Sequence, residues 1–310
     1  MNRVVVTGAT GFIGKALCFR LLEENYDVVA LSRSKEKGEK IFGTGVTVVG
    51  WDGKSSKAWQ DYANGAYAIV NLAGENIGSG RWTTEKKHAI LQSRLDAGRA
   101  VVEALKSVYN KPEVIIQASA IGYYGSREDE IIDESFSVGE GFLADVVKKW
   151  ELSTQEVESY KTRRVIIRSG VVIGKEGGAV LRLIKPFRLF VGGHLGSGKQ
   201  WFSWIHLEDE VEAILFLMQR EDLKGVFNLT APRQLIQKDF ARIMGKVMKR
   251  PSWFPVPSFV FRLFFGEMAK EMLLSGQRVV PRRLLEAGYR FVYPQAELAL
   301  NEILGKISQY

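Results

Sequence analysis

The feature that most constrains this chain is its opening stretch, where a run of valines is followed by regularly spaced glycines. Residues 4–6 are all valine, and such a short β-branched run is typical of a parallel strand covered on both faces. Gly8, Gly11 and Gly14 follow at a spacing that permits a tight turn, close approach of a pyrophosphate and close packing of the next helix. From Phe12 the apolar residues recur at helical intervals. The stretch therefore predicts a nucleotide-binding strand–helix unit.

A phosphate at the start of this first helix would be held by free backbone N–H groups and by the positive end of the helix dipole. We therefore expect the cofactor phosphates to contact the turn and the first helical residues, which are Gly8, Thr10, Gly11, Phe12, Ile13 and Gly14. The alternative is a glycine-rich turn without a ligand. Strand, glycines and helix in this order favour the nucleotide.

The second predicted strand, residues 27–31, is followed directly by Ser32 and Arg33. In a doubly wound sheet this strand end lies beside the adenosine ribose. An acidic residue there accepts from the 2′-hydroxyl of NAD, whereas an arginine accommodates the 2′-phosphate of NADP. This chain has no acid at that point, and the guanidinium of Arg33 matches a phosphate. The sequence thus predicts NADP(H) as the cofactor, and the alternative is a solvated surface arginine.

The third and fourth predicted strands supply further candidate cofactor contacts. Residues 46–49 are followed by Asp52, which either meets the adenine edge or forms a turn. The fourth strand, residues 66–74, ends in small residues that allow close backbone approach to the phosphates or to the nicotinamide ribose. The contacts expected at this strand end and in the loop after it are Leu72, Ala73, Gly74, Glu75 and Arg81.

Predicted strands and helices continue to alternate as far as residue 168. Strands at 113–119 and 164–168 flank a helix over 143–160, and a long helix covers 84–108. This order predicts an α/β fold, a Rossmann-type doubly wound parallel sheet with a smaller C-terminal α+β substrate lobe. We place the NADP-binding domain at 1–168, with returning segments near 203–230, and the substrate-side lobe at 169–310.

The charge and the cysteine content of the sequence indicate which partners to expect and in which compartment. The net charge is +8, but the basic residues are scattered, so we favour a small-molecule substrate over RNA and predict no nucleic-acid partner. Cys18 is the one cysteine of the sequence, which indicates a reducing, cytoplasmic compartment. The first strand begins within three residues of Met1, and the apolar stretch 259–265 is too short to span a bilayer. We therefore predict no signal peptide, no membrane partner and no metal site, with a homodimer as the candidate oligomeric state.

Several motifs together resemble the extended short-chain dehydrogenase/reductases, which include sugar-nucleotide epimerases and dehydratases. These motifs are residues 7–14, residues 71–73, Ser119, and residues 204–206 with Asp209. More narrowly, residues 71–76, 118–125, 168–174 and 203–206 are similar to an atypical branch called epimerase family proteins. The segment from about 255 to 305 looks like the C-terminal domain of that branch. The resemblance covers nearly the whole chain and implies NADPH as the cofactor, but it specifies no substrate.

The larger family catalyses with a serine, a tyrosine and a lysine, the last two spaced four residues apart on one helix, and its tyrosine is the general acid/base. By this resemblance Ser119 would orient the substrate and Lys149 would hold the nicotinamide ribose. Asp145 stands where the tyrosine should be, and an ionised carboxylate does not protonate an alkoxide efficiently near neutral pH. Tyr123, Tyr124 or a water near Asp145 are the candidate proton carriers, and the alternative is that both tyrosines are aromatic walls.

Two functions remain open from the sequence. One is an NADP-dependent oxidoreductase or epimerase acting on a carbonyl or secondary alcohol of a sugar nucleotide or other anionic molecule. In that case the basic stretch 182–188 and Lys199 would meet the charge of the substrate, unless they are ordinary solvated side chains. The other is an NADPH-binding sensor or interaction protein without turnover. The missing tyrosine favours it, and so would exposure of the apolar segment 253–265.

Overall fold

The centre of the molecule is a seven-stranded parallel sheet with the order β12-β7-β5-β4-β1-β2-β3. The computed structural model describes residues 1–178 and 180–305, without the side chains at 182, 260–262 and 265. The strands are β1 (Arg3–Thr7), β2 (Asp27–Ser32), β3 (Thr47–Gly50), β4 (Ala68–Asn71), β5 (Val114–Ala120), β7 (Arg163–Ser169) and β12 (Gly225–Leu229). This is the doubly wound sheet that the sequence predicts, extended at one edge by β12. The predicted fold class is confirmed, while the division into two domains stays a prediction.

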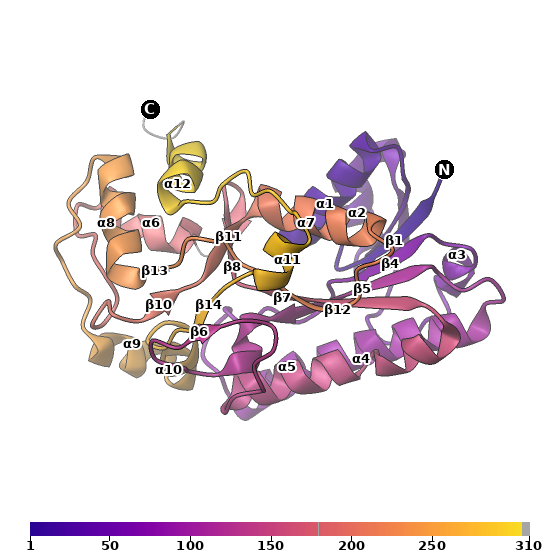
Figure 1. Cartoon of the computed structure of the whole chain (residues 1–310), viewed down its shortest axis with the longest axis horizontal. Coiled ribbons are helices and arrows are strands. Elements are labelled where there is room, and N and C mark those ends of the chain that lie inside the picture. The colour runs from indigo at the N-terminus through magenta and orange to yellow at the C-terminus, as the bar shows by residue number, and fades with distance from the viewer. Residues whose placement is uncertain (179, 306–310) are drawn as a thin grey trace.

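Helices cover both faces of this sheet (Figure 1). One face is covered by α1 (Phe12–Glu23), α2 (Lys35–Phe42) and α7 (Leu207–Gln219), and the other by α3 (Gln60–Ala63), α4 (Thr84–Ser107) and α5 (Phe142–Leu152). Val4 and Val6 pack in one hydrophobic cluster with Leu17 of α1, whereas Val5 packs in another with Val101 of α4. Successive side chains of a strand point to opposite faces. Burial on both faces therefore explains why β1 is built of valines.

The turn between β1 and α1 depends on two of its glycines. Gly8 has φ of +65°, a conformation that side chains with a Cβ rarely adopt, and it starts the turn out of β1. A Cβ on Gly14 would lie 2.4 Å from the carbonyl oxygen of Gly8 and 2.8 Å from the Cα of Ala9. The helix α1 can therefore approach the turn this closely only with glycine at position 14.

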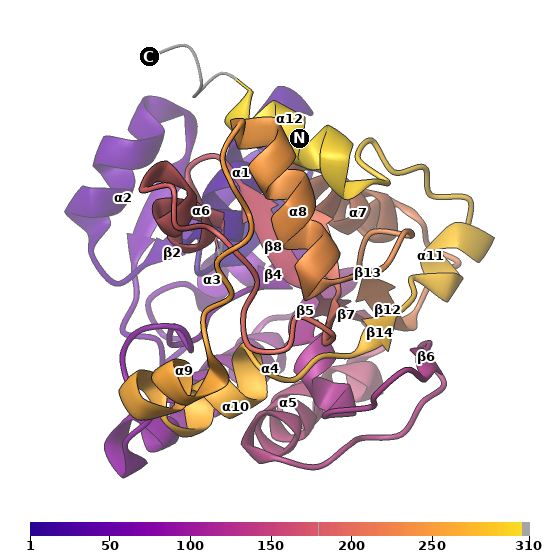
Figure 2. The same cartoon turned by 90° about the vertical axis from the view of Figure 1, so that its left-hand side faces the viewer.

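A smaller lobe faces the carboxyl ends of the strands (Figure 2). In its small sheets β8 (Val171–Gly174) pairs with β11 (Trp204–His206) and with β9 (Gly177–Gly178). In addition, β10 (Trp201–Phe202) pairs with β13 (Leu235–Ile236), and β14 (Arg278–Val279) pairs with β6 (Ile131–Ile132). Its helices are α6 (Val180–Arg188), α8 (Gln237–Met248), α9 (Ser258–Phe265), α10 (Glu267–Met272) and α12 (Ala296–Leu304). Phe187, Phe240 and Leu300 share one hydrophobic cluster, so α6, α8 and α12 pack together.

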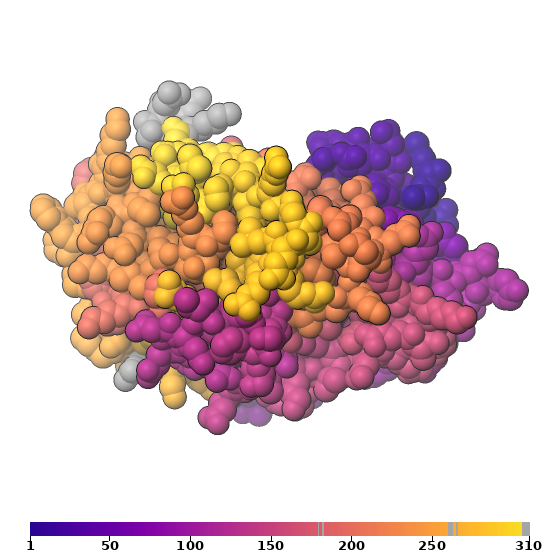
Figure 3. All heavy atoms as spheres, in the orientation of Figure 1, coloured from indigo at the N-terminus to yellow at the C-terminus, as the bar shows by residue number. Residues whose placement is uncertain are grey.

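The C-terminal segment is tied back to the sheet through α7. The buried carboxylate of Asp209 accepts hydrogen bonds from the N–H groups of Val292 at 2.7 Å and Tyr293 at 2.8 Å. The hydroxyl of Tyr289 donates to the backbone carbonyl of Asp209 at 3.0 Å. The helix α11 (Arg282–Glu286) in the same segment packs against β12. Figure 3 shows this yellow segment packed against orange residues on both of its sides.

One predicted helix differs from the structure. The helix expected over 143–160 ends at Leu152, and residues 155–160 form a separate 3₁₀ helix, η3 (Gln155–Tyr160), one of three with η1 (Gly43–Gly45) and η2 (Ile121–Tyr124) among the described residues. The hydroxyl of Ser153 donates to the carbonyl of Trp150 at 2.6 Å. Short polar side chains that bond the backbone in this way compete with helix continuation. A Cβ on Gly98 would lie 1.9 Å from Ser153 Oγ, so α4 packs directly against the point where α5 ends.

We predict that Gly14→Ala destabilises the fold, whereas Gly11→Ala does not. The added Cβ at position 14 meets backbone atoms at 2.4 and 2.8 Å, which cannot move without shifting the turn. Overpacking of this kind costs about 1–3 kcal/mol. At Gly11 the nearest atom is 3.1 Å away and the backbone is extended, with φ of −77°. Urea unfolding of both variants measures the difference, and equal midpoints would contradict the packing role of Gly14.

Candidate cofactor and substrate site

The turn between β1 and α1 forms a cradle that is open on one side. Gly11 precedes the first residue of α1 and is exposed, and within 4 Å a Cβ there would meet the carbonyl oxygen of Gly8 alone. Thr10, Phe12 and Ile13 flank it in the turn and the first helical turn. The N–H groups at the start of a helix have no partner within the helix and lie at the positive end of its dipole. A phosphate group therefore fits this cradle.

Thr7 holds the end of β4 beside the cradle, a role that the sequence analysis did not assign. Its hydroxyl oxygen accepts from the N–H groups of Leu72 and Ala73, both at 3.0 Å, and its O–H donates to Asn71 Oδ1 at 2.7 Å. A Cβ on Gly8 would lie 3.0 Å from the carbonyl carbon of Leu72. The structure thus brings the predicted contacts Leu72 and Ala73 next to the glycine turn. A buried threonine between the strand and the glycines is the signal that points to this role.

Ser32 and Arg33 lie at the end of β2, near the loop that follows β4. Ser32 is buried and donates to the carbonyl of Ser34 at 2.8 Å. The side chain of Arg33 is 85% exposed, and its Nη1 lies 4.0 Å from the carboxylate of Glu75. Lys86 donates a hydrogen bond of 2.6 Å to Glu75, which lowers the pKa of that carboxyl. Since its own contact is long, the guanidinium of Arg33 is free to engage an anion.

Three further predicted contacts have partners of their own. Asp52 accepts from the N–H groups of residues 54 and 55 at 2.8 and 3.0 Å, which is the turn-forming alternative. The guanidinium of Arg81 lies against the lobe, since a Cβ on Gly266 would be 3.3 Å from Arg81 Nε. Gly74 packs against Arg94, whose Cζ would lie 3.1 Å from a Cβ at position 74. The cofactor roles of these residues stay predictions.

A cavity of about 1470 Å³ lies between the carboxyl ends of the strands and the lobe. The sheet side contributes Phe12, Ala120, Ile121 and Ser169, and the lobe contributes residues of α6, β10, α8 and α10. Phe12 is the first residue of α1, so the cavity adjoins the phosphate cradle. Open α/β sheets bind their ligands at this edge. Cradle and cavity together form a continuous candidate site.

Three of the residues predicted to be catalytic belong to a buried ion-pair network instead of lining this cavity. Arg168 donates Nε and Nη2 to the two carboxylate oxygens of Glu151, at 2.8 and 2.9 Å. Ser119 donates to Glu151 Oε1 at 2.5 Å. The hydroxyl of Tyr124 accepts from Arg168 at 3.0 Å and donates to Asn228 at 2.7 Å, and burial raises the pKa of Tyr124 to about 12. The ring of Tyr123 stacks on the Arg168 guanidinium, with Cζ 3.4 Å from the ring centroid. Neither tyrosine lines the cavity, so the structure supports neither a proton carrier nor an aromatic wall at these positions.

The structure also places Asp145 and Lys149 away from the cavity. They form an ion pair of 2.7 Å on α5, and about half of each side chain is exposed. The residues of α5 that do line the cavity are Leu143, Ala144, Val146, Val147 and Trp150. Leu143 and Val147 have the spacing of four that the larger family uses for its tyrosine and lysine. On the cavity side of α5 these positions are therefore apolar.

On the face of the sheet that α7 covers, opposite α5, a serine hydroxyl is hydrogen-bonded to a buried carboxyl group. Ser169 lines the cavity at the end of β7 and donates to Glu210 Oε1 of α7 at 2.5 Å. Glu210 is fully buried, and its Oε2 has no hydrogen-bond partner among the described residues. Burial raises the pKa of Glu210 to about 8. Glu210 therefore holds a proton at neutral pH, next to the hydroxyl of a residue that lines the cavity.

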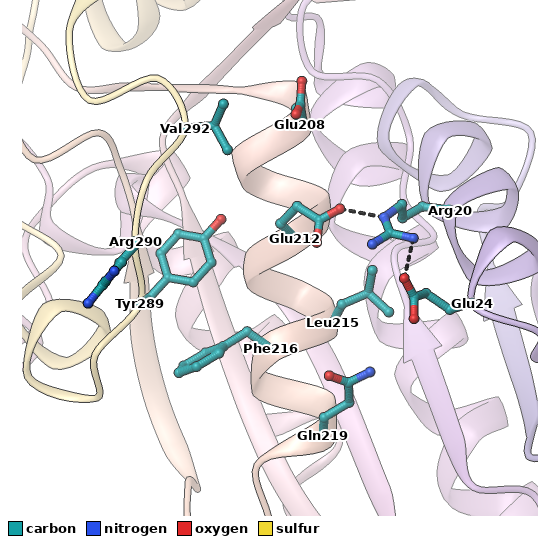
Figure 4. A pocket seen from close by; sticks show the side chains of 10 residues that line it. All are labelled: Arg20, Glu24, Glu208, Glu212, Leu215, Phe216, Gln219, Tyr289, Arg290 and Val292. Atoms are coloured by element: carbon teal, nitrogen blue, oxygen red, sulfur yellow. Dashed lines mark hydrogen bonds and ion pairs between the residues drawn. The ribbon is translucent and has the colours of Figure 1, made fainter.

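A second, smaller depression of about 380 Å³ lies between α1, α7 and the C-terminal segment (Figure 4). Arg20 crosses from α1 to Glu212 of α7 at 2.5 Å and also pairs with Glu24 at 2.5 Å. Tyr289 and Phe216 close its other side. The ion pair of Arg20 with Glu212 fastens α7 to α1 across this depression. Among the helices of the described chain, none is long and apolar enough to cross a membrane.

We predict that Glu210→Gln removes a pH dependence from the stability of the fold. Folded Glu210 keeps its proton up to about pH 8, whereas the unfolded chain releases it near 4.5. The wild type therefore loses stability as the pH rises through this window, by up to about 1.4 kcal/mol per pH unit. Urea unfolding at pH 5 and pH 8 should show a larger loss in the wild type than in Glu210→Gln. Glu208→Gln, an exposed change on the same helix, is the control and should match the wild type.

Comparison with known proteins agrees with this arrangement. The profile of the NAD dependent epimerase/dehydratase family matches residues 4–230, and that of a domain of unknown function, DUF1731, matches residues 256–303. The chain is 40% identical to the chloroplastic SDR39U1 homologue of Arabidopsis thaliana, an epimerase family protein, over 97% of this chain and 86% of the relative. It is 35% identical to the epimerase family protein YfhF of Bacillus subtilis, with 97% of each chain covered.

A solved structure shows the same fold throughout. The crystal structure of human epimerase family protein SDR39U1 with NADPH matches with a TM-score of 0.88 and 34% identity, over 98% of this chain and 99% of that chain. The resemblance predicted from the motifs is confirmed, and with it the predicted class of cofactor, a nicotinamide dinucleotide. The chain belongs to the NAD dependent epimerase/dehydratase family.

Proposed function

We propose that this chain is an NADP(H)-dependent oxidoreductase or epimerase that acts on a carbonyl or secondary alcohol. The observation that carries the proposal is the continuity of the phosphate cradle with a substrate-sized cavity at Phe12. The cofactor would supply the hydride, with its pyrophosphate against Gly11 and its reactive ring toward the cavity. The human relative named above was crystallised with NADPH, which supports the choice of cofactor.

The end of β2 supports NADP(H) over NAD(H). At the strand end where NAD-binding proteins carry an acid, this chain has Ser32 and Arg33. The Arg33 guanidinium is largely exposed. Its nearest carboxylate, on Glu75, is held by Lys86 at 2.6 Å. A 2′-phosphate would therefore meet an arginine that is not committed to a tight ion pair.

For the proton we propose Ser169 in place of the missing tyrosine. A carbonyl oxygen whose carbon accepts a hydride must take up one proton. With Glu210 protonated, its carboxyl O–H would donate to Ser169 Oγ across the same 2.5 Å contact, which frees the Ser169 O–H for the carbonyl oxygen. Ser169 would pass its proton to that oxygen and recover one from Glu210. After product release the buried Glu210 carboxylate would regain its proton from solvent in the cavity by way of Ser169. Both groups are already hydrogen-bonded to each other at 2.5 Å. Such positioned acids contribute about 10²- to 10⁴-fold to a rate.

A second candidate function, an NADPH-binding interaction protein without turnover, is favoured by one surface feature. In the segment that contains α9, Trp253, Phe259 and Leu263 are exposed by 76%, 67% and 68%. Large apolar side chains exposed together mark contact surfaces on many proteins. Oxidation of NADPH by any member of a carbonyl panel would favour the enzyme, whereas tight binding without turnover would favour this alternative. A cytoplasmic location and a homodimer stay predictions.

We predict that Arg33→Ala weakens the binding of NADPH about 10- to 100-fold and leaves the binding of NADH nearly unchanged. The two cofactors differ only in the 2′-phosphate, which is the group assigned to Arg33. Calorimetry with both nucleotides measures the effect. Lys40→Ala, an exposed cation of α2, is the matched control and should leave both affinities unaltered. Equal losses for NADPH and NADH would remove the 2′-phosphate assignment.

We predict that Ser169→Ala lowers turnover at least about 100-fold while the affinity for NADPH stays within about twofold of wild type. The reason is that the variant loses the proton donor and leaves the cradle unaltered. Glu210→Gln should lower turnover as well and abolish the fall in rate that the wild type shows as the pH rises through about 8. Stopped-flow and steady-state rates over pH 5–10 measure both effects. A Ser169→Ala enzyme with normal turnover would rule out this proton route.

A further inference from the structure

We infer that the cavity takes a bulky, largely apolar substrate with a single acidic group, and not a sugar nucleotide. The inference rests on the proposed function for the position of the cofactor beside the cavity. It is drawn from the chemistry of the cavity wall, which can be tested by binding alone.

The wall of the cavity is built mainly of apolar side chains from both halves of the molecule. Ile121 and Val147 line it from the sheet side, and Leu183, Phe187, Trp201 and Phe240 line it from the lobe. Its volume of about 1470 Å³ exceeds that of ordinary small-ligand pockets, which enclose about 300–1,000 Å³. Removal of apolar ligand surface from water is favourable in proportion to its area. A wall of this kind therefore favours an extended or polycyclic apolar molecule.

Several polar side chains of the wall are already bonded to the protein. Gln200 Nε2 donates to the carbonyls of Leu195 and Leu273, both at 3.0 Å, and Gln237 accepts from the N–H of Leu195 at 2.8 Å. Ser203 donates to the carbonyl of Gln277 at 2.7 Å. The hydroxyls of a sugar ring need donors and acceptors from the protein, since buried polar groups without partners are costly. The polar groups of these side chains that bond to the protein are therefore not available to the hydroxyls of a sugar.

The described basic residues that the sequence predicted to meet the charge of the substrate do not line the cavity. Lys185 and Arg188 of α6 and Lys199 are exposed, whereas their neighbours Leu183, Pro186 and Phe187 face the cavity. The side chain at 182, part of the predicted basic stretch, lies outside the described residues. Glu271, a charged residue of the wall, uses its carboxylate on the N–H groups of Phe142 and Leu143. A diphosphate needs several cationic partners, and the cations of the described wall come from three separate elements: Arg94 from α4, Arg127 from the loop after η2 and Lys270 from α10.

Among the described side chains, three cations line the cavity, and they are Arg94, Arg127 and Lys270. Arg127 donates to the carbonyls of Tyr124 at 3.2 Å and Ser137 at 3.4 Å, and Lys270 is exposed, so the cation considered for the ligand is Arg94. Its Nη1 donates to the carbonyls of Glu75 and Ile90 at 3.1 and 2.9 Å, and its guanidinium covers the ring of Trp150 at 4.7 Å. Among the described residues, no carboxylate lies within ion-pair distance of it. A guanidinium has five N–H donors, so it can still bind a carboxylate. Burial lowers the pKa of Arg94 to about 10, and it therefore stays charged at neutral pH.

The test compares three probes on the full chain, with and without NADP⁺. They are cis-parinaric acid, a fluorescent polyene with one carboxylate, its methyl ester, and UDP-glucose. We expect the acid to bind best, the ester about tenfold more weakly and UDP-glucose more weakly still. Arg94→Gln should bring the acid down to the level of the ester without changing the ester. Tighter binding of UDP-glucose than of the acid would overturn the inference.

A matched pair of variants on α6 locates the probe. Leu183→Glu puts a charge into the wall and should weaken the acid at least about tenfold, whereas Lys185→Glu changes an exposed residue of the same helix and should not. If Leu183→Glu fails to fold, Leu183→Trp fills the cavity without a charge and should have the same effect. Equal binding by the α6 variants would place the probe elsewhere on the surface and overturn the inference. Absence of carbonyl turnover, by contrast, would count against the proposed function and leave these affinities untouched.

Discussion

The ion pair between Arg168 and Glu151 is the interaction on which the end of the sheet depends. It is bidentate and nearly fully buried, with 4% and 10% of the two side chains exposed. It joins β7 to α5 and, through Ser119, Tyr124 and Asn228, also to β5 and β12. Removing one partner of such a pair leaves a buried charge and costs about 3–5 kcal/mol. The network is therefore a structural requirement of the fold, and it occupies groups that would otherwise be available for chemistry.

The alternation of side chains along β5 and β7 decides which hydroxyl groups join the Arg168–Glu151 network. Ser119 and Arg168 are paired in register on neighbouring strands, so their side chains point to the same face, toward Glu151. The next pair in register, Ala120 and Ser169, points to the opposite face, toward α7 and Glu210. A shift of one residue along a strand moves a side chain to the other face. On the α5 side of the sheet end, the polar groups of Ser119 and Arg168 are therefore bonded to Glu151. On the α7 side, Ser169 lines the cavity.

The sequence was sufficient for features that depend on neighbouring residues. The valines of β1, the glycine turn and α1 follow from local spacing and periodicity, and the carboxyl ends of parallel strands meet at one edge whatever the rest of the chain does. The catalytic assignments depend on which face α5 turns toward the cavity, and tertiary packing decides this. Asp145 and Lys149 have the same spacing as Leu143 and Val147, but the second pair is the one that lines the cavity. Spacing alone cannot distinguish the two pairs.

The apolar face of α5 has a consequence for chemistry as well as for packing. Where a tyrosine and a lysine would place a hydroxyl and a charge beside the substrate, Leu143 and Val147 extend the apolar wall instead. An unpaired charge is costly in such surroundings, and a neutral hydroxyl–carboxyl pair costs less. Ser169 and Glu210 are such a pair, fixed by β7 and α7 before any ligand arrives. A donor fixed in advance needs no reorganisation during a reaction. The loss of the tyrosine on one helix is thus compatible with proton transfer from the opposite side of the sheet.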